Sequence, residues 1–260
     1  MLMQQQHQVG DLSLEAYGSN LDDIQKALSS KTWFGFDLDD TLHEFRKASA
    51  SASSAVFKAI RNENPNIRIE DLDTTYRDIL RSKTAGAFTD GRTSTEYRRE
   101  RFSHLLQVHG IAPSEDYINR LLAIYQNSLG NSLRLKTGAL QLLQRLKTLG
   151  KKVIVMTEGP QDAQEWTVSE LGLRSYIDIL ITTNEIGKSK IDGLFPIVLD
   201  KYNIAALDIV YVGDNEQRDI FPARAAGIMT VLYDERSDCR FENAEVFRLN
   251  SLLKLKYLVG

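Results

Sequence analysis

The sequence predicts an α/β fold, in which a parallel β-sheet carries helices on both faces and an all-helical domain is inserted. Short, continuously apolar runs alternate with amphipathic helices, as expected for parallel strands that are buried on both sides. The segment between the first strand and residue 133 is helical throughout. At roughly ninety residues it is too long for an ordinary connection, which indicates an inserted domain.

The core elements can be placed by their apolar runs and their breakers. Trp33, Phe34 and Phe36 predict a first buried strand, and a short amphipathic helix at 19–29 precedes it. Later strands are expected at 151–157, 176–181, 208–212, 228–233 and 246–249. Helices are expected between them at 138–149, 161–171, 195–202 and 219–226.

The inserted segment shows four helical patterns, at 48–61, 70–82, 95–109 and from about 115 onward, where Ser114 can cap the helix. We therefore divide the chain into a leader and short helix (1–30), a discontinuous core (31–43 and 134–260) and a helical cap domain (44–133). Arg98, Arg99 and Arg101 are interpreted as a solvated helix face.

Composition limits the classes of partner and compartment. The chain has 260 residues and a formal net charge of −3, so we expect neither a nucleic acid polymer nor a membrane as partner. Its single cysteine, Cys239, cannot form an internal disulfide, which indicates a reducing, cytoplasmic setting. The first residues show no secretory signal pattern. Composition says nothing about the oligomeric state.

Three carboxylates stand where the first buried strand ends, at Asp37, Asp39 and Asp40. Asp37 and Asp39 are two apart, so an extended backbone sends both side chains to the same face. Like charges at the end of a buried strand repel each other. A cation between them, or a chemical role, would explain them, although a turn or a helix cap would use the same residue types.

Other polar residues follow the later strands, and ligands of parallel sheets bind at the carboxyl ends of the strands. This edge is expected to gather Thr157, a lysine at 188 or 190, and two further carboxylates, Asp214 and Asp219. Clustered carboxylates suit Mg²⁺, and a lysine and a hydroxyl can hold phosphate oxygens. An ionised aspartate is also a known nucleophile, so the set favours phosphoryl transfer.

Four ordered blocks of sequence resemble the motifs of the haloacid dehalogenase (HAD) superfamily. They are Asp37-Leu38-Asp39-Asp40-Thr41, Thr157 at a strand end, Gly187-Lys188-Ser189-Lys190, and Val212-Gly213-Asp214 continuing to Asp219-Ile220. The resemblance implies a Rossmann-like core, and the inserted helices are similar to the family's helical (C1-type) cap.

The resemblance also implies roles for individual residues. Asp37 would be the nucleophile and Asp39 the general acid and base. Mg²⁺ would be held by the carboxylates of Asp37 and Asp214 and by the backbone carbonyl of Asp39. Thr157 and Lys190 would bind the phosphoryl group, and Asp219 would be a supporting residue. The aspartate at position 39 is similar to that of phosphatases and phosphomutases rather than dehalogenases.

The third block departs from the family pattern, because Ile191 stands where a proline is common. Lys188 therefore remains a rival to Lys190, with Lys190 favoured by its spacing from Gly187. Substrate choice should depend on the cap and on residues after Leu42, where Arg46 or Lys47 could reach a substrate anion.

The predicted function is that of a Mg²⁺-dependent phosphatase for a small phosphorylated metabolite, of the nucleotide or sugar phosphate class. Hydrolysis would pass through an aspartyl-phosphate. A phosphomutase using the same residues is the first alternative. A catalytically silent binding protein on this fold is the second.

Overall fold

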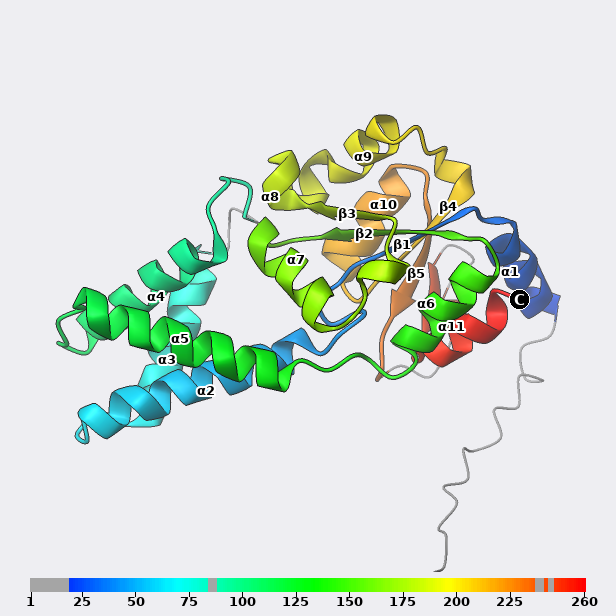
Figure 1. Ribbon diagram of the computed structural model, residues 1–260. Helices are drawn as coiled ribbons and strands as arrows, with labels where there is room; N and C mark the ends of the chain where they lie inside the picture. Colours follow the sequence, from blue (N-terminus) through cyan, green and yellow to red (C-terminus); the bar gives the residue numbers. More distant parts are fainter. Residues whose placement is uncertain (1–18, 84–87, 237–240, 243–245) are drawn as a thin grey trace, which may run out of the picture.

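A parallel β-sheet forms the centre of the molecule, as the sequence predicts. The computed structural model describes residues 19–83, 88–236, 241–242 and 246–260 (Figure 1). Within these residues seven strands pair in the order β3-β2-β1-β4-β5-β7-β6. Six are parallel, and β6 runs antiparallel to β7 at one edge. Their bounds are β1 Trp33–Phe36, β2 Lys152–Thr157, β3 Ile179–Thr182, β4 Ile209–Gly213, β5 Met229–Tyr233, β6 Phe241–Glu242 and β7 Val246–Leu249.

The alternation of side chains along the strands divides the core into two layers. In the register of the sheet, Phe34 of β1 lies between Val153 of β2 and Val210 of β4. These three side chains belong to one buried cluster, whereas Ile154 and Tyr211, each one position further along, belong to another on the opposite face. Because both faces are apolar, the sheet needs a cover on each side.

Helices cover both faces. The first cluster includes residues of α1 (Ser19–Ser30), α6 (Ala139–Thr148), α7 (Gln161–Glu170) and α11 (Leu252–Leu258). The second includes residues of α9 (Phe195–Lys201) and α10 (Phe221–Ala225), and α8 (Thr183–Ile186) packs at its margin. The expected α/β fold with helices on both faces is therefore confirmed.

Four helices project from this core as a separate body, which we call the four-helix unit (Figure 1). They are α2 (Phe45–Glu63), α3 (Ile69–Lys83), α4 (Ser94–Val108) and α5 (Glu115–Ser132). The unit has its own buried cluster, with Phe57, Phe102 and Leu121 among its members. Side chains cap the starts of α4 and α5: the Thr93 hydroxyl accepts from Glu96 N–H in a capping box, and Ser114 accepts from Tyr117 N–H.

The chain enters and leaves the four-helix unit through one paired connection. Glu44 N–H donates to the carbonyl of Arg134 at 2.9 Å, and Lys136 N–H donates to the carbonyl of Leu42 at 2.9 Å. His43 also forms an isolated antiparallel bridge with Leu135. We call these two segments, 42–44 and 134–136, the connecting ribbon.

The structure differs from the sequence-based expectations at several elements. The strand expected at 176–181 begins only at Ile179, because Arg174–Tyr176 form a short 3₁₀ turn. The helix expected at 219–226 is a distorted turn over Glu216–Ile220 followed by α10, with Pro222 at the start of the regular helix. Helices α8 and α11 and strand β6 were not expected. Cys239 lies outside the described residues.

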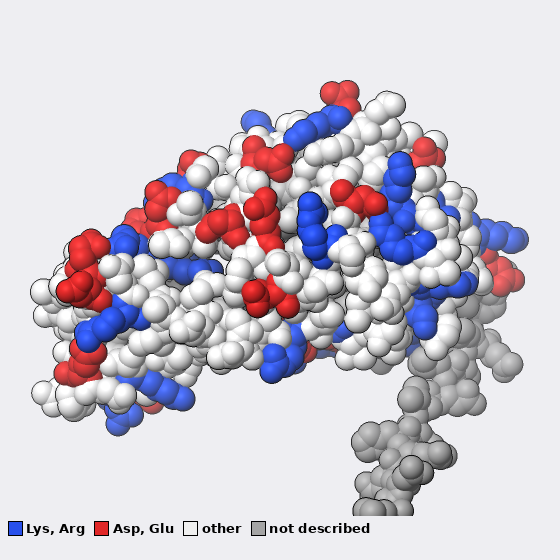
Figure 2. Space-filling view, in the orientation of Figure 1, with Lys and Arg blue, Asp and Glu red and all other residues white. Residues whose placement is uncertain are grey.

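The surface gives no sign of a single-charge binding face on the side shown in Figure 2, where acidic and basic side chains are mixed. Among the described residues no helix combines the length and apolar character that a membrane crossing requires.

Candidate active site

The carboxyl ends of β1 and β4 bring the predicted acidic residues together. Asp37 directly follows β1, and its N–H donates to the carbonyl of Val212 at 2.9 Å, which fixes its backbone against β4. Asp214 directly follows β4, and Asp219 lies in the next turn. Asp37 is 6% exposed and Asp219 is 2% exposed, so both carboxylates are withdrawn from bulk water.

A buried lysine joins two of these carboxylates. Lys190 Nζ lies 2.6 Å from Asp37 Oδ1 and 2.6 Å from Asp219 Oδ1, and the side chain is 2% exposed. Lys188, the rival lysine, is exposed. The structure thus brings Lys190, not Lys188, into contact with the predicted nucleophile.

Burial and charge act on these groups in opposite directions. Burial raises the pKa of Asp37 well above its ordinary value, and the ammonium of Lys190 opposes this shift. Burial alone would lower the pKa of Lys190, but the carboxylates of Asp219 and Asp37 outweigh it and raise that pKa. A nucleophilic carboxylate must be ionised, so Lys190 favours the reactive form of Asp37.

Two glycines make room for this arrangement. Gly35 allows the ring of Tyr211 to cross β1, since a Cβ on Gly35 would lie 2.8 Å from Tyr211 Cδ2. The Tyr211 hydroxyl lies 2.9 Å from the carbonyl of Met156 and 3.3 Å from Asp219 Oδ1. A Cβ on Gly213 would lie 2.5 Å from Asp219 Cβ. The position of Asp219, and of Lys190 in contact with it, therefore depends on Gly35 and Gly213 having no side chain.

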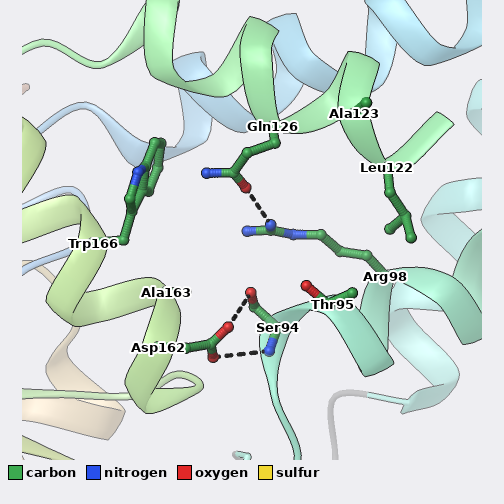
Figure 3. Close-up of a pocket in the computed structure, with 9 residues that line it drawn as sticks. All are labelled: Ser94, Thr95, Arg98, Leu122, Ala123, Gln126, Asp162, Ala163 and Trp166. Atoms are coloured by element: carbon green, nitrogen blue, oxygen red, sulfur yellow. Dashed lines mark hydrogen bonds between the residues drawn. The ribbon is translucent and has the colours of Figure 1, made fainter. Parts of the chain in front are cut away.

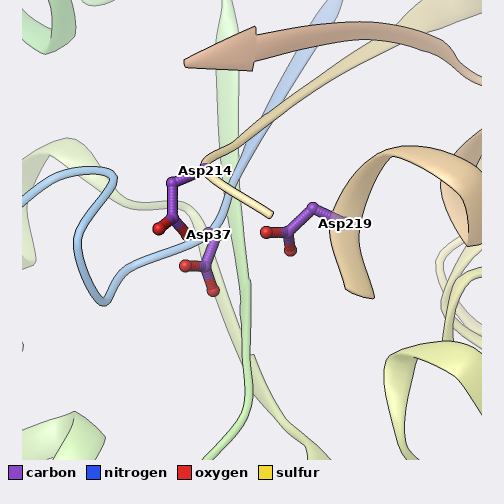
Figure 4. A group of neighbouring side chains, drawn as sticks. All are labelled: Asp37, Asp214 and Asp219. Carbon is purple, nitrogen blue, oxygen red and sulfur yellow. The ribbon is translucent and has the colours of Figure 1, made fainter. Parts of the chain in front are cut away.

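Three carboxylates form a group that suits a divalent cation. Oxygens of Asp37, Asp214 and Asp219 lie within 4.8 Å of one another, and the side chains converge in Figure 4. Burial raises the pKa of Asp214, and the neighbouring Asp219 carboxylate adds to this shift. Carboxylate oxygens are the hard ligands that Mg²⁺ prefers, so the residues present fit the predicted metal. Asp219 joins Asp37 and Asp214 here, whereas the sequence analysis assigned the third ligand to the Asp39 carbonyl.

Asp39 is held at both carboxylate oxygens. His43 Nε2 lies 2.8 Å from Oδ1, and Gln164 Nε2 donates to Oδ2 at 3.4 Å. His43 is fully buried in the connecting ribbon, and Gln164 belongs to α7. Sequence analysis gave neither residue a role. The only feature of the sequence that could have indicated a role for His43 is its place as a polar residue just after an apolar strand.

Thr157 is close to this group but lies beneath the surface. It ends β2, is 0% exposed, and its hydroxyl lies 3.5 Å from Gln164 Oε1. It is not among the residues that line the cavity described below.

A cavity of about 560 Å³ lies between these residues and the four-helix unit. Asp37, Asp39, Lys190, Asp214 and Asp219 line it from the core side. The opposite wall is largely aromatic and basic, and comes from α2, α3, the segment before α4, α4 and α5: Phe45, Arg46, Tyr76, Phe88, Tyr97, Arg98, Arg101 and Tyr125. Lys47, which the sequence analysis named beside Arg46, instead pairs with Glu44 at 2.7 Å and does not line the cavity.

A second cavity, of about 380 Å³, lies beside the first, where α4 and α5 meet α7 (Figure 3). At its edge both oxygens of Asp162 accept hydrogen bonds from Ser94, at 2.9 Å from its N–H and 2.7 Å from its hydroxyl. This contact joins the first turn of α7, in the core, to the first turn of α4, in the four-helix unit.

Comparison with known proteins agrees with the fold. A family model for haloacid dehalogenase-like hydrolases matches residues 35–233. Phosphoglycolate phosphatase of Xanthomonas campestris pv. campestris is 32% identical over 199 residues, covering 75% of this chain and 80% of the relative. Glyceraldehyde 3-phosphate phosphatase of Methanocaldococcus jannaschii is 27% identical over 227 residues, covering 86% and 95%. The magnesium-bound HAD-hydrolase YfnB of Bacillus subtilis superposes with a TM-score of 0.67 at 22% identity, covering 88% and 98%.

The fold and the family match define a hydrolase with a Rossmann-like core. The chain belongs to the haloacid dehalogenase-like hydrolases, and within that family it is an enzyme of the phosphatase type.

Proposed function

We propose that the protein is a Mg²⁺-dependent phosphatase that hydrolyses a small phosphomonoester through an aspartyl-phosphate at Asp37. The observation that carries this proposal is the buried contact of Lys190 with both Asp37 and Asp219 at the floor of a cavity. A cationic group beside an anionic nucleophile lets a phosphate dianion approach a carboxylate that would otherwise repel it.

In the first step an oxygen of Asp37 bonds to phosphorus while the bond from phosphorus to the substrate oxygen breaks. Asp39 donates its proton to that leaving oxygen. In the second step the Asp39 carboxylate takes a proton from water, the water oxygen attacks phosphorus, and the bond to Asp37 breaks to release inorganic phosphate. Asp39 lines the same cavity as Asp37, in keeping with these two roles.

Mg²⁺ would be held by Asp37 and Asp214, with the Asp39 carbonyl or Asp219 completing the set, and would neutralise negative charge on the phosphoryl group. Lys190 would hold phosphoryl oxygens, and Asp219 would orient Lys190. Thr157 remains a proposed phosphate ligand. Its hydroxyl would have to turn from Gln164 toward the cavity for that role.

We propose that the four-helix unit is the cap of this site, within the domain boundaries predicted from the sequence. It contributes one wall of the cavity, whose volume of about 560 Å³ suits a small metabolite. A phosphorylated side chain on a folded protein would have to enter beneath these helices.

The test is release of inorganic phosphate by the purified protein with MgCl₂, first from p-nitrophenyl phosphate and then from a panel of phosphorylated metabolites. We expect turnover of the aryl phosphate and faster turnover of part of the panel. No release from any compound would overturn the proposal in favour of a silent binding protein. Isomerisation of a sugar phosphate without release of free phosphate would instead identify a mutase.

A further inference from the structure

Charge is divided between the two walls of the large cavity. The core contributes every carboxylate that lines the cavity, together with the basic residues Lys190 and Arg218, whereas every charged side chain that the four-helix unit contributes is an arginine: Arg46, Arg98 and Arg101. Binding of a phosphate ester and one metal cation would explain the carboxylates on the core side of the cavity. Neither of these ligands explains the arginines on the opposite wall.

Arg46 is already matched by the core. Its Nε lies 3.1 Å from Asp40 Oδ2, and its Nη2 lies 3.0 Å from Asp214 Oδ2. These two contacts balance the positive charge of Arg46, which is therefore not an unpaired cation in the cavity.

Arg98 and Arg101 differ from Arg46, because neither pairs with a carboxylate in the part of the chain that the structure describes. Arg98 donates to the neutral Gln126 Oε1 at 2.6 Å, a contact seen in Figure 3, and lies 4.8 Å from the centre of the Tyr125 ring. Arg101 lies 5.7 Å from the ring centres of both Phe88 and Tyr97.

Arg101 also carries a polar atom without a partner. Its Nε is buried and makes no hydrogen bond within the described residues. A buried N–H on a cationic group is costly when it is left unpaired, so its presence in a ligand-sized cavity indicates a partner supplied by a ligand. The two aromatic rings lie beside the guanidinium without occupying its N–H groups, which leaves these available to an anion.

These arginines were interpreted as a solvated helix face, and that interpretation is wrong for two of them. Arg98 and Arg101 are three residues apart and share one side of α4, which faces the cavity. Arg99 lies on another side of the helix. It donates to Glu115 Oε2 at 2.5 Å and to Asn119 Oδ1 at 2.8 Å, and does not line the cavity.

We propose that Arg101, supported by Arg98, binds a second acidic group of the substrate, a carboxylate or a second phosphate, while the phosphomonoester meets Asp37. This inference rests on the proposed function and narrows its substrate class to phosphate esters with two separate anions. Guanidinium groups bind both kinds of anion in the same bidentate manner. Of the two phosphatases compared above, one is named for phosphoglycolate, which has such a carboxylate, and the other for glyceraldehyde 3-phosphate, which has no second anion.

The test compares kcat/KM within pairs of substrates that differ mainly in the second anion. One pair is 2-phosphoglycolate against 2-hydroxyethyl phosphate, and the other is fructose 1,6-bisphosphate against fructose 6-phosphate. We expect the wild-type protein to prefer the two-anion member of at least one pair by tenfold or more. Which pair shows the preference distinguishes a carboxylate from a phosphate as the second anion. In Arg101→Met kcat/KM for the two-anion member should fall by about tenfold or more while that for its partner changes little, so that the preference is largely lost, as expected when a charge-assisted hydrogen bond is removed.

Arg99→Met is the matched control, because it removes an equal charge from the same helix without altering the cavity wall, and it should keep the wild-type preference. Arg98→Met serves as the second variant if Arg101→Met does not fold. Equal hydrolysis of both members of both pairs by the wild-type protein would overturn the second-anion site while leaving the phosphatase proposal intact. A preference that survives in both Arg101→Met and Arg98→Met would also overturn it. Absence of any phosphate release would count against the phosphatase proposal itself.

Discussion

His43 Nε2 lies 2.8 Å from Asp39 Oδ1, and this is the one hydrogen bond that the buried imidazole ring makes within the described residues. A carboxyl oxygen that bears no hydrogen can only accept, and Asp39 Oδ1 in that form receives its hydrogen from Nε2. His43 therefore fixes the orientation of the carboxyl group to which we assign proton transfer.

We expect His43→Ala to lower kcat by about 10- to 100-fold, because Asp39 loses the donor that orients it. KM for p-nitrophenyl phosphate should change little, since His43 does not line the cavity. Steady-state kinetics would separate the two parameters. His104→Ala, at an exposed histidine of α4, is the control. A kcat equal to that of the wild-type protein would show that Asp39 needs no such support.

Substitution of the two aspartates after β1 should have different outcomes. Asp37→Asn should abolish turnover, because an amide cannot form the covalent intermediate. Asp39→Asn should slow turnover by about 10²- to 10⁴-fold. An aryl phosphate, whose leaving group needs little protonation, should still phosphorylate Asp37 in this variant. Intact mass spectrometry would detect the added phosphoryl group. A phosphoryl group on the Asp37→Asn protein would rule out Asp37 as the nucleophile.

Lys190→Ala should reduce both stability and activity, because it leaves the buried carboxylates of Asp37 and Asp219 without their counter-charge. We expect the free energy of unfolding to fall by about 3–5 kcal/mol in the absence of metal, together with a large loss of kcat/KM. Lys188→Ala, at an exposed position nearby, should change the free energy of unfolding by no more than about 0.5 kcal/mol. Denaturant titration and phosphate release measure the two effects. Equal behaviour of the two variants would contradict the assignment.

Mg²⁺ should stabilise the folded protein, because it relieves repulsion among Asp37, Asp214 and Asp219. A metal concentration 100 times Kd would add about 2.7 kcal/mol to the free energy of unfolding. Thermal unfolding with MgCl₂ and with EDTA would measure this as a difference in Tm. Asp214→Asn should diminish the difference, whereas Asp116→Asn, at an exposed site on α5, should preserve it. A Tm that does not respond to Mg²⁺ in the wild-type protein would contradict the metal assignment.

Gly213→Ala should damage the site without altering any charged group. The new Cβ would lie 2.5 Å from both Cβ and Cγ of Asp219, so that side chain must move and Lys190 must follow. We expect a loss of about 1–3 kcal/mol in the free energy of unfolding, with reduced kcat/KM. Gly130→Ala is the control, because its Cβ would be 3.5 Å from the Trp166 ring and in ordinary contact. Unimpaired activity in Gly213→Ala would show that Asp219 can shift freely.

The sequence predicts most of the sheet because burial on both faces leaves a simple signature. The runs that form β1, β2, β4 and β5 are apolar at almost every position, so their place along the chain is visible without knowledge of their order in space. The order β3-β2-β1-β4-β5 depends on long-range packing and was not predicted. Helix α11 was missed because Leu252–Leu258 alternates leucine and lysine over part of its length, a pattern that also suits a strand.

The candidate site was predicted where the chain itself fixes the geometry. Asp37 and Asp214 each follow a strand by one residue, so their meeting follows from the parallel sheet. The contact between His43 and Asp39 depends on a tight turn in which Asp40 adopts a positive φ of 62°. No local sequence pattern predicts this turn. The roles that we propose for Arg98 and Arg101 depend on which side of α4 faces the cavity, and this is decided by packing between two distant parts of the chain.

The connecting ribbon has a mechanical consequence. Two chain segments that are hydrogen-bonded to each other behave as a strap rather than as two independent tethers. Such a strap resists sliding along its length and bends more easily across its width. Tilting of the four-helix unit is therefore favoured over shear. Because His43 is part of the connecting ribbon and also contacts Asp39, bending of the ribbon would displace the residue that orients this carboxyl group.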